Sequence, residues 1–239
     1  MAAPASVTIK SLDGKWVLAK SLSDATDPVL ALQGLGWLTR KAIGLATVTQ
    51  HVSSWTTPAD TTDATSATPL THMKIEQFAT GGIKGTTENR TLDWMYRPHT
   101  DHLFGSLQGK SRYTTLAALL AENTSTTSTP NSTSTSGSTP PAAKAANVAA
   151  DARYLCASDA SESEAQGGWL PESRDGEVVE AYVENDGAGW TAWQVWGFSS
   201  VGGDGERWLT RRFAVRRTDR EEVVRVRLVY EWRGAVEEG

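Results

Sequence analysis

The sequence has little of what several functional classes require. It holds one cysteine, Cys156, in 239 residues, so no internal disulfide can form and no oxidising compartment is implied. It has no uninterrupted apolar run of about 18 residues, so no transmembrane helix is expected. Its net charge of −5 argues against nucleic acid as the main partner, because phosphate binding favours a basic surface. The first residues lack the basic and apolar regions of a signal peptide, so we expect a cytoplasmic protein.

Catalytic and metal-binding motifs are equally sparse. The four histidines, His51, His72, His99 and His102, do not have the spacing of a closed ligand set. Cys156 lies in a stretch of low complexity, and no nucleophile stands beside an obvious base. We therefore expect no metal and no other cofactor, and the sequence assigns no catalytic residue.

One stretch contains almost no core-forming residues. Residues 122–167 begin with a Ser/Thr-rich segment of low complexity and continue with an Ala-rich segment, residues 142–152, that is at best a marginal helix. Such a composition buries too little apolar surface to offset the entropy lost on ordering. Strand patterns of the same style occur on both sides of the stretch. We therefore expect a single domain over residues 1–239, interrupted at residues 122–167 by a disordered insertion that the fold does not need.

Strand patterns dominate the rest of the chain. Apolar alternation and turn residues predict ten strands, at residues 14–20, 46–55, 71–79, 86–97, 102–107, 110–116, 177–184, 190–199, 207–217 and 222–233. Between the first two, residues 24–44 carry a helical pattern that Gly34 and Gly36 interrupt, which predicts two short helices joined by a tight turn. A meander of ten strands favours an all-β, closed, up-and-down barrel, because closure removes the exposed sheet edges.

Two local motifs connect this chain order with a known family. Residues 14–21 read GKWVLAKS and resemble the first-strand signature of the intracellular lipid-binding, or fatty-acid-binding, proteins of the calycin and lipocalin superfamily. Residues 35–43 read LGWLTRKAI and resemble the second helix of the same family. The overall style is similar to an uncharacterised branch that looks fungal. The resemblance implies a ten-stranded barrel with a helix-turn-helix lid after the first strand.

The resemblance also implies a function. It points to the binding or carriage of an apolar small molecule, such as a fatty acid or a similar lipophilic metabolite, by a monomer. The helix pair would act as the lid, and Arg40 and Lys41 would offer a transient basic contact to a membrane surface. The alternative is a barrel enzyme that promotes cyclisation or isomerisation of a lipophilic biosynthetic intermediate. Such catalysis depends mainly on shape and orientation, so it leaves little motif to find.

The last predicted strand decides which head group the cavity can hold. Family members grip a carboxylate with an Arg-x-Tyr motif, whereas here Leu228 stands two residues before Tyr230. Because side chains alternate along a strand, Arg225 and Arg227 face the opposite side from Tyr230. Either the arginines face inward and the head group is anionic, or Tyr230 faces inward with Leu228 and Trp232. We favour the second arrangement, since the apolar alternation from Val224 to Trp232 is unbroken.

Other strands supply further candidates. The last two strands carry four arginines, Arg211, Arg212, Arg225 and Arg227. An inward guanidinium would form a bidentate pair with a ligand carboxylate, whereas outward ones would form a solvated face paired with glutamates. We take Arg211 and Arg227 as the candidate ligand contacts. Trp190 and Trp196 share one parity and Trp193 has the other, so both faces of that strand carry a tryptophan. We take Trp196 as a candidate flat surface for a ligand ring. A polar run at residues 89–93 would either place Asn89, Thr91 and Asp93 in the lumen or form an ordinary wet face.

Overall fold

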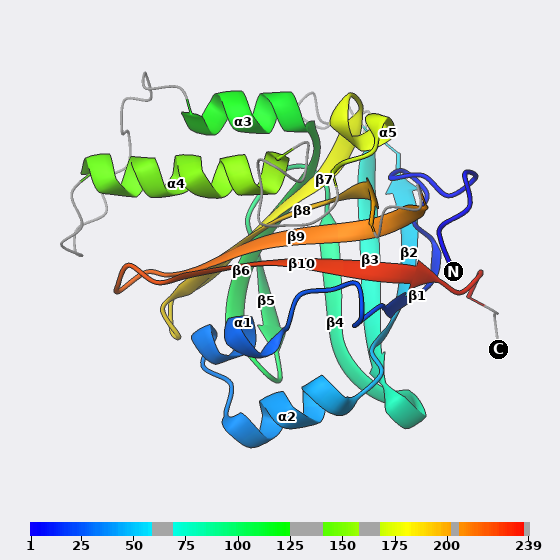
Figure 1. The fold of residues 1–239 in the computed structure, drawn as a ribbon, viewed down its shortest axis with the longest axis horizontal. Coiled ribbons are helices and arrows are strands. Elements are labelled where there is room, and N and C mark those ends of the chain that lie inside the picture. The colour runs from blue at the N-terminus through cyan, green and yellow to red at the C-terminus, as the bar shows by residue number, and fades with distance from the viewer. Residues whose placement is uncertain (59–68, 125–140, 158–167, 202–205, 237–239) are drawn as a thin grey trace.

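The computed structural model describes residues 1–58, 69–124, 141–157, 168–201 and 206–236. The strands are β1 Gly14–Leu18, β2 Thr49–Thr57, β3 Leu70–Ala79, β4 Ile83–Thr91, β5 Arg97–Asp101, β6 Gly105–Thr115, β7 Glu177–Asn185, β8 Trp190–Ser200, β9 Arg207–Arg217 and β10 Val223–Trp232. All pairings are antiparallel, in the spatial order β4-β3-β2-β1-β10-β9-β8-β7-β6-β5. The predicted ten-stranded up-and-down barrel is therefore confirmed (Figure 1).

The barrel is nearly closed. Strands β4 and β5 stand at the two ends of the hydrogen-bonded order and do not pair with each other. The chain bridges this break just after β4, where Leu92 forms an isolated bridge with Ser111 of β6 and the backbone N–H of Trp94 donates to the Ser111 carbonyl at 2.8 Å. The wall is thus continuous except for a narrow break beside β5.

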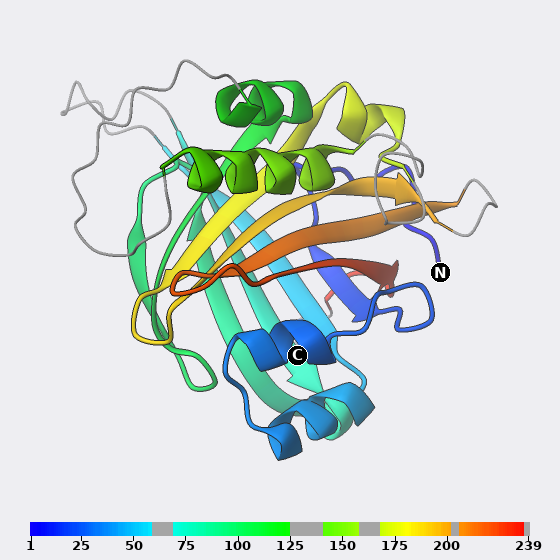
Figure 2. The same ribbon diagram turned by 60° about the vertical axis from the view of Figure 1, so that its left-hand side comes forward.

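Two short helices cover one end of the barrel, as expected from the sequence (Figure 2). Helix α1 spans Asp27–Leu32 with a proline in its first turn, and α2 spans Trp37–Leu45. Between them Gly34 has φ of 89°, a left-handed conformation that a residue with a Cβ rarely adopts. Val29 and Leu32 are buried on the inner side of the lid. They join an apolar cluster with Trp190 of β8, so the lid closes on the interior.

The boundaries of several strands differ from the prediction, most clearly around β5. Residues 98–101 lie between two of the predicted strands, yet they belong to β5. The turn comes after β5, at residues 102–104, where the Asp101 carboxylate accepts the backbone N–H groups of Leu103 at 2.7 Å and Phe104 at 3.1 Å. An Asp side chain that hydrogen-bonds to the backbone two or three residues further on stabilises a turn after it. The residues before Asp101 are therefore free to form a strand.

The expectation of disorder is wrong for part of residues 122–167. Helix α3 spans Leu116–Thr124, α4 spans Pro141–Cys156, α5 spans Pro171–Arg174, and a single 3-10 turn, η1, covers Thr80–Gly82. Helices α3 and α4 lie across the outer face of the barrel (Figure 1). In α4, Ala152 and Leu155 are fully buried against a cluster that includes Leu119 and Trp193. Small residues let α4 approach the sheet closely, so an Ala-rich segment acquires a packed face. The remainder, residues 125–140 and 158–167, lies outside the described residues.

The main core fills the end of the barrel away from the lid. Trp16 is fully buried, its ring packs edge-on against Trp232 at 4.8 Å between centroids, and its Nε1 donates to the Leu12 carbonyl at 2.9 Å. Trp196 and Tyr230 belong to the same cluster. The first-strand motif therefore supplies the base of the barrel. Of the helices in the described residues, none combines the length and apolarity needed to span a bilayer.

Candidate ligand-binding cavity

A cavity of about 630 Å³ occupies the space between the lid helices and the tryptophan-rich core. This volume lies within the range of roughly 300–1,000 Å³ that is typical of small-molecule sites. Much of the lining is apolar and comes from both the lid and the wall, including Val29, Trp190, Phe213, Val226 and Leu228. The interior is thus suited to a ligand with a large hydrocarbon part.

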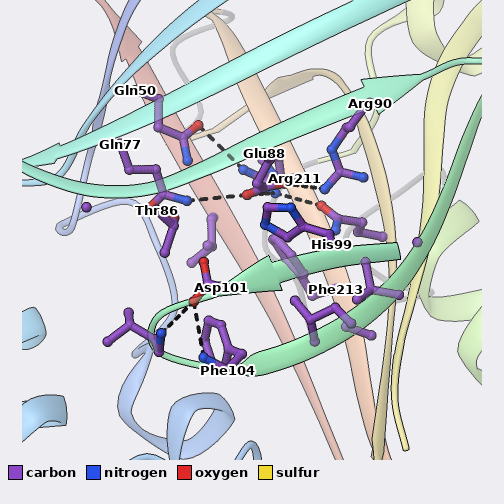
Figure 3. A pocket seen from close by; sticks show the side chains of 18 of the residues that line it. Gln50, Gln77, Thr86, Glu88, Arg90, His99, Asp101, Phe104, Arg211 and Phe213 are labelled. Atoms are coloured by element: carbon purple, nitrogen blue, oxygen red, sulfur yellow. Dashed lines mark hydrogen bonds and ion pairs between the residues drawn. The ribbon is translucent and has the colours of Figure 1, made fainter. Parts of the chain in front are cut away.

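A cluster of charged side chains interrupts this apolar lining (Figure 3). Strand β4 points Glu88 and Arg90 inward, and the two form an ion pair. Arg211 of β9 approaches the same carboxylate at 4.0 Å, and Gln77 of β3 donates to it at 3.3 Å. Arg90 also donates to the Ser111 hydroxyl at 3.0 Å across the break in the barrel. Residues from four strands therefore meet at one polar site inside the barrel.

Arg211 is held in place mainly by neutral groups. Its Nη2 donates to Gln194 Oε1 at 2.7 Å and its Nη1 to Gln50 Oε1 at 3.4 Å. The guanidinium lies 3.8 Å from the ring centroid of Trp196, within the range of a cation–π contact. The Trp196 Nε1 in turn donates to the same Gln194 oxygen at 2.8 Å. Amides and a ring fix the position of Arg211 without cancelling its charge.

The electrostatics leave the cluster positive. Burial alone would raise the pKa of Glu88, but the charges of Arg90 and Arg211 outweigh burial and hold that pKa below its ordinary value. Glu88 is therefore ionised, and one carboxylate beside two guanidinium groups gives a net charge of +1. A group that is electron-rich, or that becomes so, is favoured next to such a site because the surrounding apolar interior screens charge weakly.

Several polar atoms of the cavity lining have no hydrogen-bond partner among the described residues. They are Nε of Arg90, Nε of Arg211, Nε2 of His99 and Nε1 of Trp190, and all are buried. An unpaired buried polar group costs about 1–3 kcal/mol, so native proteins rarely keep one without a reason. A ligand with oxygen acceptors would satisfy the donors in this group.

The structure brings together three of the six residues that the sequence predicts as ligand contacts. Arg211, Leu228 and Tyr230 line the cavity. Trp196 and Trp232 face the interior but belong to the core beneath the cavity, where Trp196 supports Arg211 from below. Burial raises the pKa of Tyr230, so its hydroxyl keeps its proton and can donate to a ligand. The favoured facing of the last strand is confirmed, and contact with a ligand stays a prediction.

Arg227 does not reach the cavity. It lies on the outer face of β10, where its Nη2 donates to the Leu22 carbonyl at 3.0 Å. Its neighbour Arg225 is also outside and pairs with Asp151 of α4 at 2.8 Å. The alternative with both arginines inward is therefore wrong, because the apolar alternation of β10 outweighs the two charges.

Sequence reasoning missed most of the polar cluster. It weighed Asn89, Thr91 and Asp93 as lumen residues, whereas Glu88 and Arg90 are the side chains that point into the cluster, with Asn89 and Thr91 only bordering the cavity. The sequence did hold a signal for them. Thr86, Glu88 and Arg90 are every second residue of the same strand, so they share the face opposite to Asn89 and Thr91. Nothing in the sequence indicated that Gln50, Gln194 and His99 line the cavity, because only the curvature of the barrel brings their strands to one site.

The fold and cavity define a nearly closed ten-stranded barrel with an internal small-molecule site. No family model matches the chain. Over 114 residues the chain is 35% identical to a probable pericyclase, scpY, from Mollisia scopiformis, covering 48% of this chain and 56% of that protein. Over 119 residues it is 29% identical to the pericyclase pydY from Acremonium sp, covering 50% and 60%. The matches thus span little more than half the length of these curated relatives.

Solved structures of lipid-binding proteins are similar to the chain at low sequence identity. Lipid binding protein 8 of Caenorhabditis elegans matches with a TM-score of 0.45 at 10% identity, covering 96% of this chain and 100% of that one. The REP1-NXSQ fatty acid transporter matches with a TM-score of 0.41 at 12% identity, covering 94% and 98%. At such identities the likeness concerns the fold alone.

Proposed function

We propose that the chain binds a lipophilic small molecule in its cavity and promotes a pericyclic cyclisation of that molecule. Two curated relatives carry the name pericyclase, which favours the enzymatic alternative over simple carriage. The observation that carries the proposal is a positive polar cluster in a cavity whose lining is in large part apolar.

A pericyclic reaction suits such a cavity. Bonds form and break in one concerted step, so no nucleophile has to attack the substrate. The apolar wall would hold a flexible chain folded with its reacting ends in contact, and good orientation of this kind is worth up to about 7–11 kcal/mol. Tyr230 and Arg211 would donate to a carbonyl conjugated with one of the reacting double bonds. Fixed donors aimed at developing charge lower the barrier further.

A second candidate function is carriage of the same class of ligand without chemical change. The lid favours it, because α2 exposes Trp37 and Leu38 at 64% and 74% beside the exposed Lys41. These side chains would support transient contact with an acidic membrane surface by a cytoplasmic monomer. Arg40 would contribute less, since its Nε already pairs with Asp27 at 3.2 Å.

A synthetic substrate separates the two candidates. The probe is a linear ketone in which a conjugated diene is tethered to an enone, so that an intramolecular cycloaddition is available. Carriage predicts binding with the same rate and product ratio as in buffer. Cyclisation predicts a faster reaction with one dominant enantiomer, measured by chiral chromatography.

Variants then locate the site. Tyr230→Phe removes one hydroxyl from the cavity, so we expect about a tenfold lower rate from the loss of one hydrogen bond of roughly 1–1.5 kcal/mol. Tyr182→Phe makes the same change on the outer side of β7, against Trp193, and is the matched control. A rate that falls equally in both variants would point to a loss of fold rather than to a contact with the substrate.

A further inference from the structure

His99 is a cavity residue that the proposed cyclisation does not use. It lies on β5, opposite Leu107 of β6, at the edge of the break in the barrel. Figure 3 shows its ring pointing into the cavity beside Glu88 and Arg211. Its Nε2 is buried, and no described residue forms a hydrogen bond with it. A histidine with this placement has one ring nitrogen directed at whatever occupies the cavity.

The chemistry of that nitrogen narrows what it can do. In the neutral tautomer with the proton on Nδ1, Nε2 carries a lone pair and accepts a proton or a hydrogen bond. The neighbouring guanidinium groups of Arg90 and Arg211 carry donors that could satisfy such a lone pair, but no hydrogen bond joins either of them to Nε2. The carboxylate of Glu88 is engaged by Arg90 and Gln77. The partner that suits Nε2 is therefore an acidic proton of the ligand.

We propose that His99 is a general base that removes a proton from the carbon next to a ligand carbonyl, so that the cavity catalyses enolisation. The C–H bond breaks, its proton moves to Nε2, and its electron pair forms the carbon–carbon double bond while the carbonyl electrons move onto oxygen. The oxygen becomes negative beside the net positive cluster. Return of the proton to the same carbon restores the ketone, and its return to the γ-carbon of an unsaturated ketone gives the isomer with the same atoms.

The surroundings support both halves of this step. The turn after β5 is fixed by the two backbone hydrogen bonds to Asp101, which holds the strand that carries His99. Arg211 is positioned by Gln50, Gln194 and Trp196 without losing its charge, so it can stabilise an enolate oxygen. A base and an oxyanion stabiliser that face one cavity are the two groups that enolisation requires.

This inference rests on the proposed binding of a carbonyl compound and gives the bound molecule a role before the cyclisation. Enolisation of an unsaturated ketone produces an electron-rich dienolate, and such dienes react readily with an enone. The substrate class is therefore a lipophilic ketone or aldehyde with an acidic C–H group and an unsaturated chain.

The experiment uses the full chain and a β,γ-unsaturated ketone with a straight alkyl tail. Binding is measured first, by displacement of the neutral dye Nile red. Proton transfer is then followed as conversion to the conjugated ketone by its ultraviolet absorbance, and as deuterium incorporation next to the carbonyl in deuterium oxide. We expect both signals above the buffer rate. His99→Gln should lower both about a hundredfold, the usual scale of general-base catalysis, and leave dye displacement unchanged.

Two further variants make the result specific. His102→Gln alters an exposed histidine in the same hairpin and should leave the exchange rate unchanged. His99→Phe keeps a ring in the position, so it should retain the fold and the binding but lose the exchange. If the ketone binds but exchanges at the buffer rate, or if both His99 variants keep the wild-type rate, the general base is overturned and the proposed cyclisation is untouched. If neither dye nor ketone binds, the proposed function fails and this inference falls with it.

Discussion

Arg211 and Arg212 are adjacent in β9, yet they lie on opposite faces of the barrel wall and are fixed in different ways. Both are buried, at 3% and 0% exposure. Arg212 donates to the carbonyls of Tyr154 at 3.2 Å and Ala157 at 2.7 Å, at the C-terminal end of α4, and its guanidinium lies 4.5 Å from the Trp169 ring centroid. A cation at a helix C-terminus is favoured by the helix dipole. Arg211 instead lies at the wall of the cavity, where it donates to Gln50 and Gln194, so burial alone does not tell which side of the barrel wall an arginine faces.

The same contrast extends along the two faces. Outside, Asp151 of α4 accepts from Arg216 at 2.9 Å and from Arg225 at 2.8 Å. Both partners of each ion pair belong to the protein, and the pairs anchor α4 to the barrel. Inside, the Glu88 cluster has excess positive charge and unpaired atoms beside a cavity. The outer contacts therefore stabilise the fold, and we propose that the inner cluster binds a ligand.

The largest expected effect comes from removing the outer cluster altogether. Deleting residues 122–167 takes away α4, uncovers Leu119 and Trp193, and leaves Arg216 and Arg225 without Asp151. We expect a loss of about 5 kcal/mol or more, comparable to the whole stability of a domain. Thermal melts followed by near-ultraviolet circular dichroism provide the measurement. A deletion limited to residues 125–140, with α3 and α4 joined by a flexible linker, is the control. Equal melting of the two deletions would show that α4 contributes nothing.

The next largest effect is a difference in the stability lost when Arg212 or Arg211 is replaced by methionine. Arg212→Met leaves two buried carbonyl acceptors with a lost charged partner, so we expect about 3 kcal/mol lower stability in urea titrations. Arg211→Met breaks hydrogen bonds to the side chains of Gln50 and Gln194 but none to the backbone, and it removes one of two like charges, so we expect a smaller cost of about 1–2 kcal/mol. A larger loss in Arg211→Met than in Arg212→Met would reverse the assignment of the two faces.

The smallest expected effect concerns the pH dependence of stability, to which Glu88 and Glu180 contribute with opposite signs. The pKa of Glu88 is below its ordinary value of 4.5, so its contribution to stability is present above that value and is lost as the pH falls through its lowered pKa. Burial raises the pKa of Glu180, on the outer face under α3, despite its bond from Arg112 at 2.7 Å. Stability therefore decreases as the pH rises from 4.5 through that raised pKa.

Gln variants test these signs through the pH dependence of the urea midpoint. Glu88→Gln should flatten the loss of stability in acid. Glu180→Gln should flatten the loss that accompanies rising pH. Slopes that change in the same direction in both variants would contradict the contrast between the inner and outer clusters.

Local patterns in the sequence were enough for the barrel and for part of the site. Strand alternation and the turn residues gave ten strands, and parity correctly placed Leu228 and Tyr230 inside. The packing of α4 and the polar cluster could not be predicted, because both depend on contacts between distant segments. Helix α4 is held by Arg216 and Arg225, which lie 65 and 74 residues after their partner Asp151. Glu88 meets Arg211 only when strands far apart in sequence curve around one interior.

Our proposal is that Arg211 recognises an oxygen-bearing head group inside the cavity. It is tested most directly by the affinities of two ligands with the same unsaturated chain, one ending in a ketone and the other in a hydrocarbon. The unmodified chain and Arg212→Met should prefer the ketone by about 1.5–3 kcal/mol, the scale of a hydrogen bond to a charged group. Arg211→Met should lose most of this preference and keep only the part that the Tyr230 hydroxyl supplies. A ketone preference in Arg211→Met as large as in the unmodified chain would contradict the proposed role of Arg211.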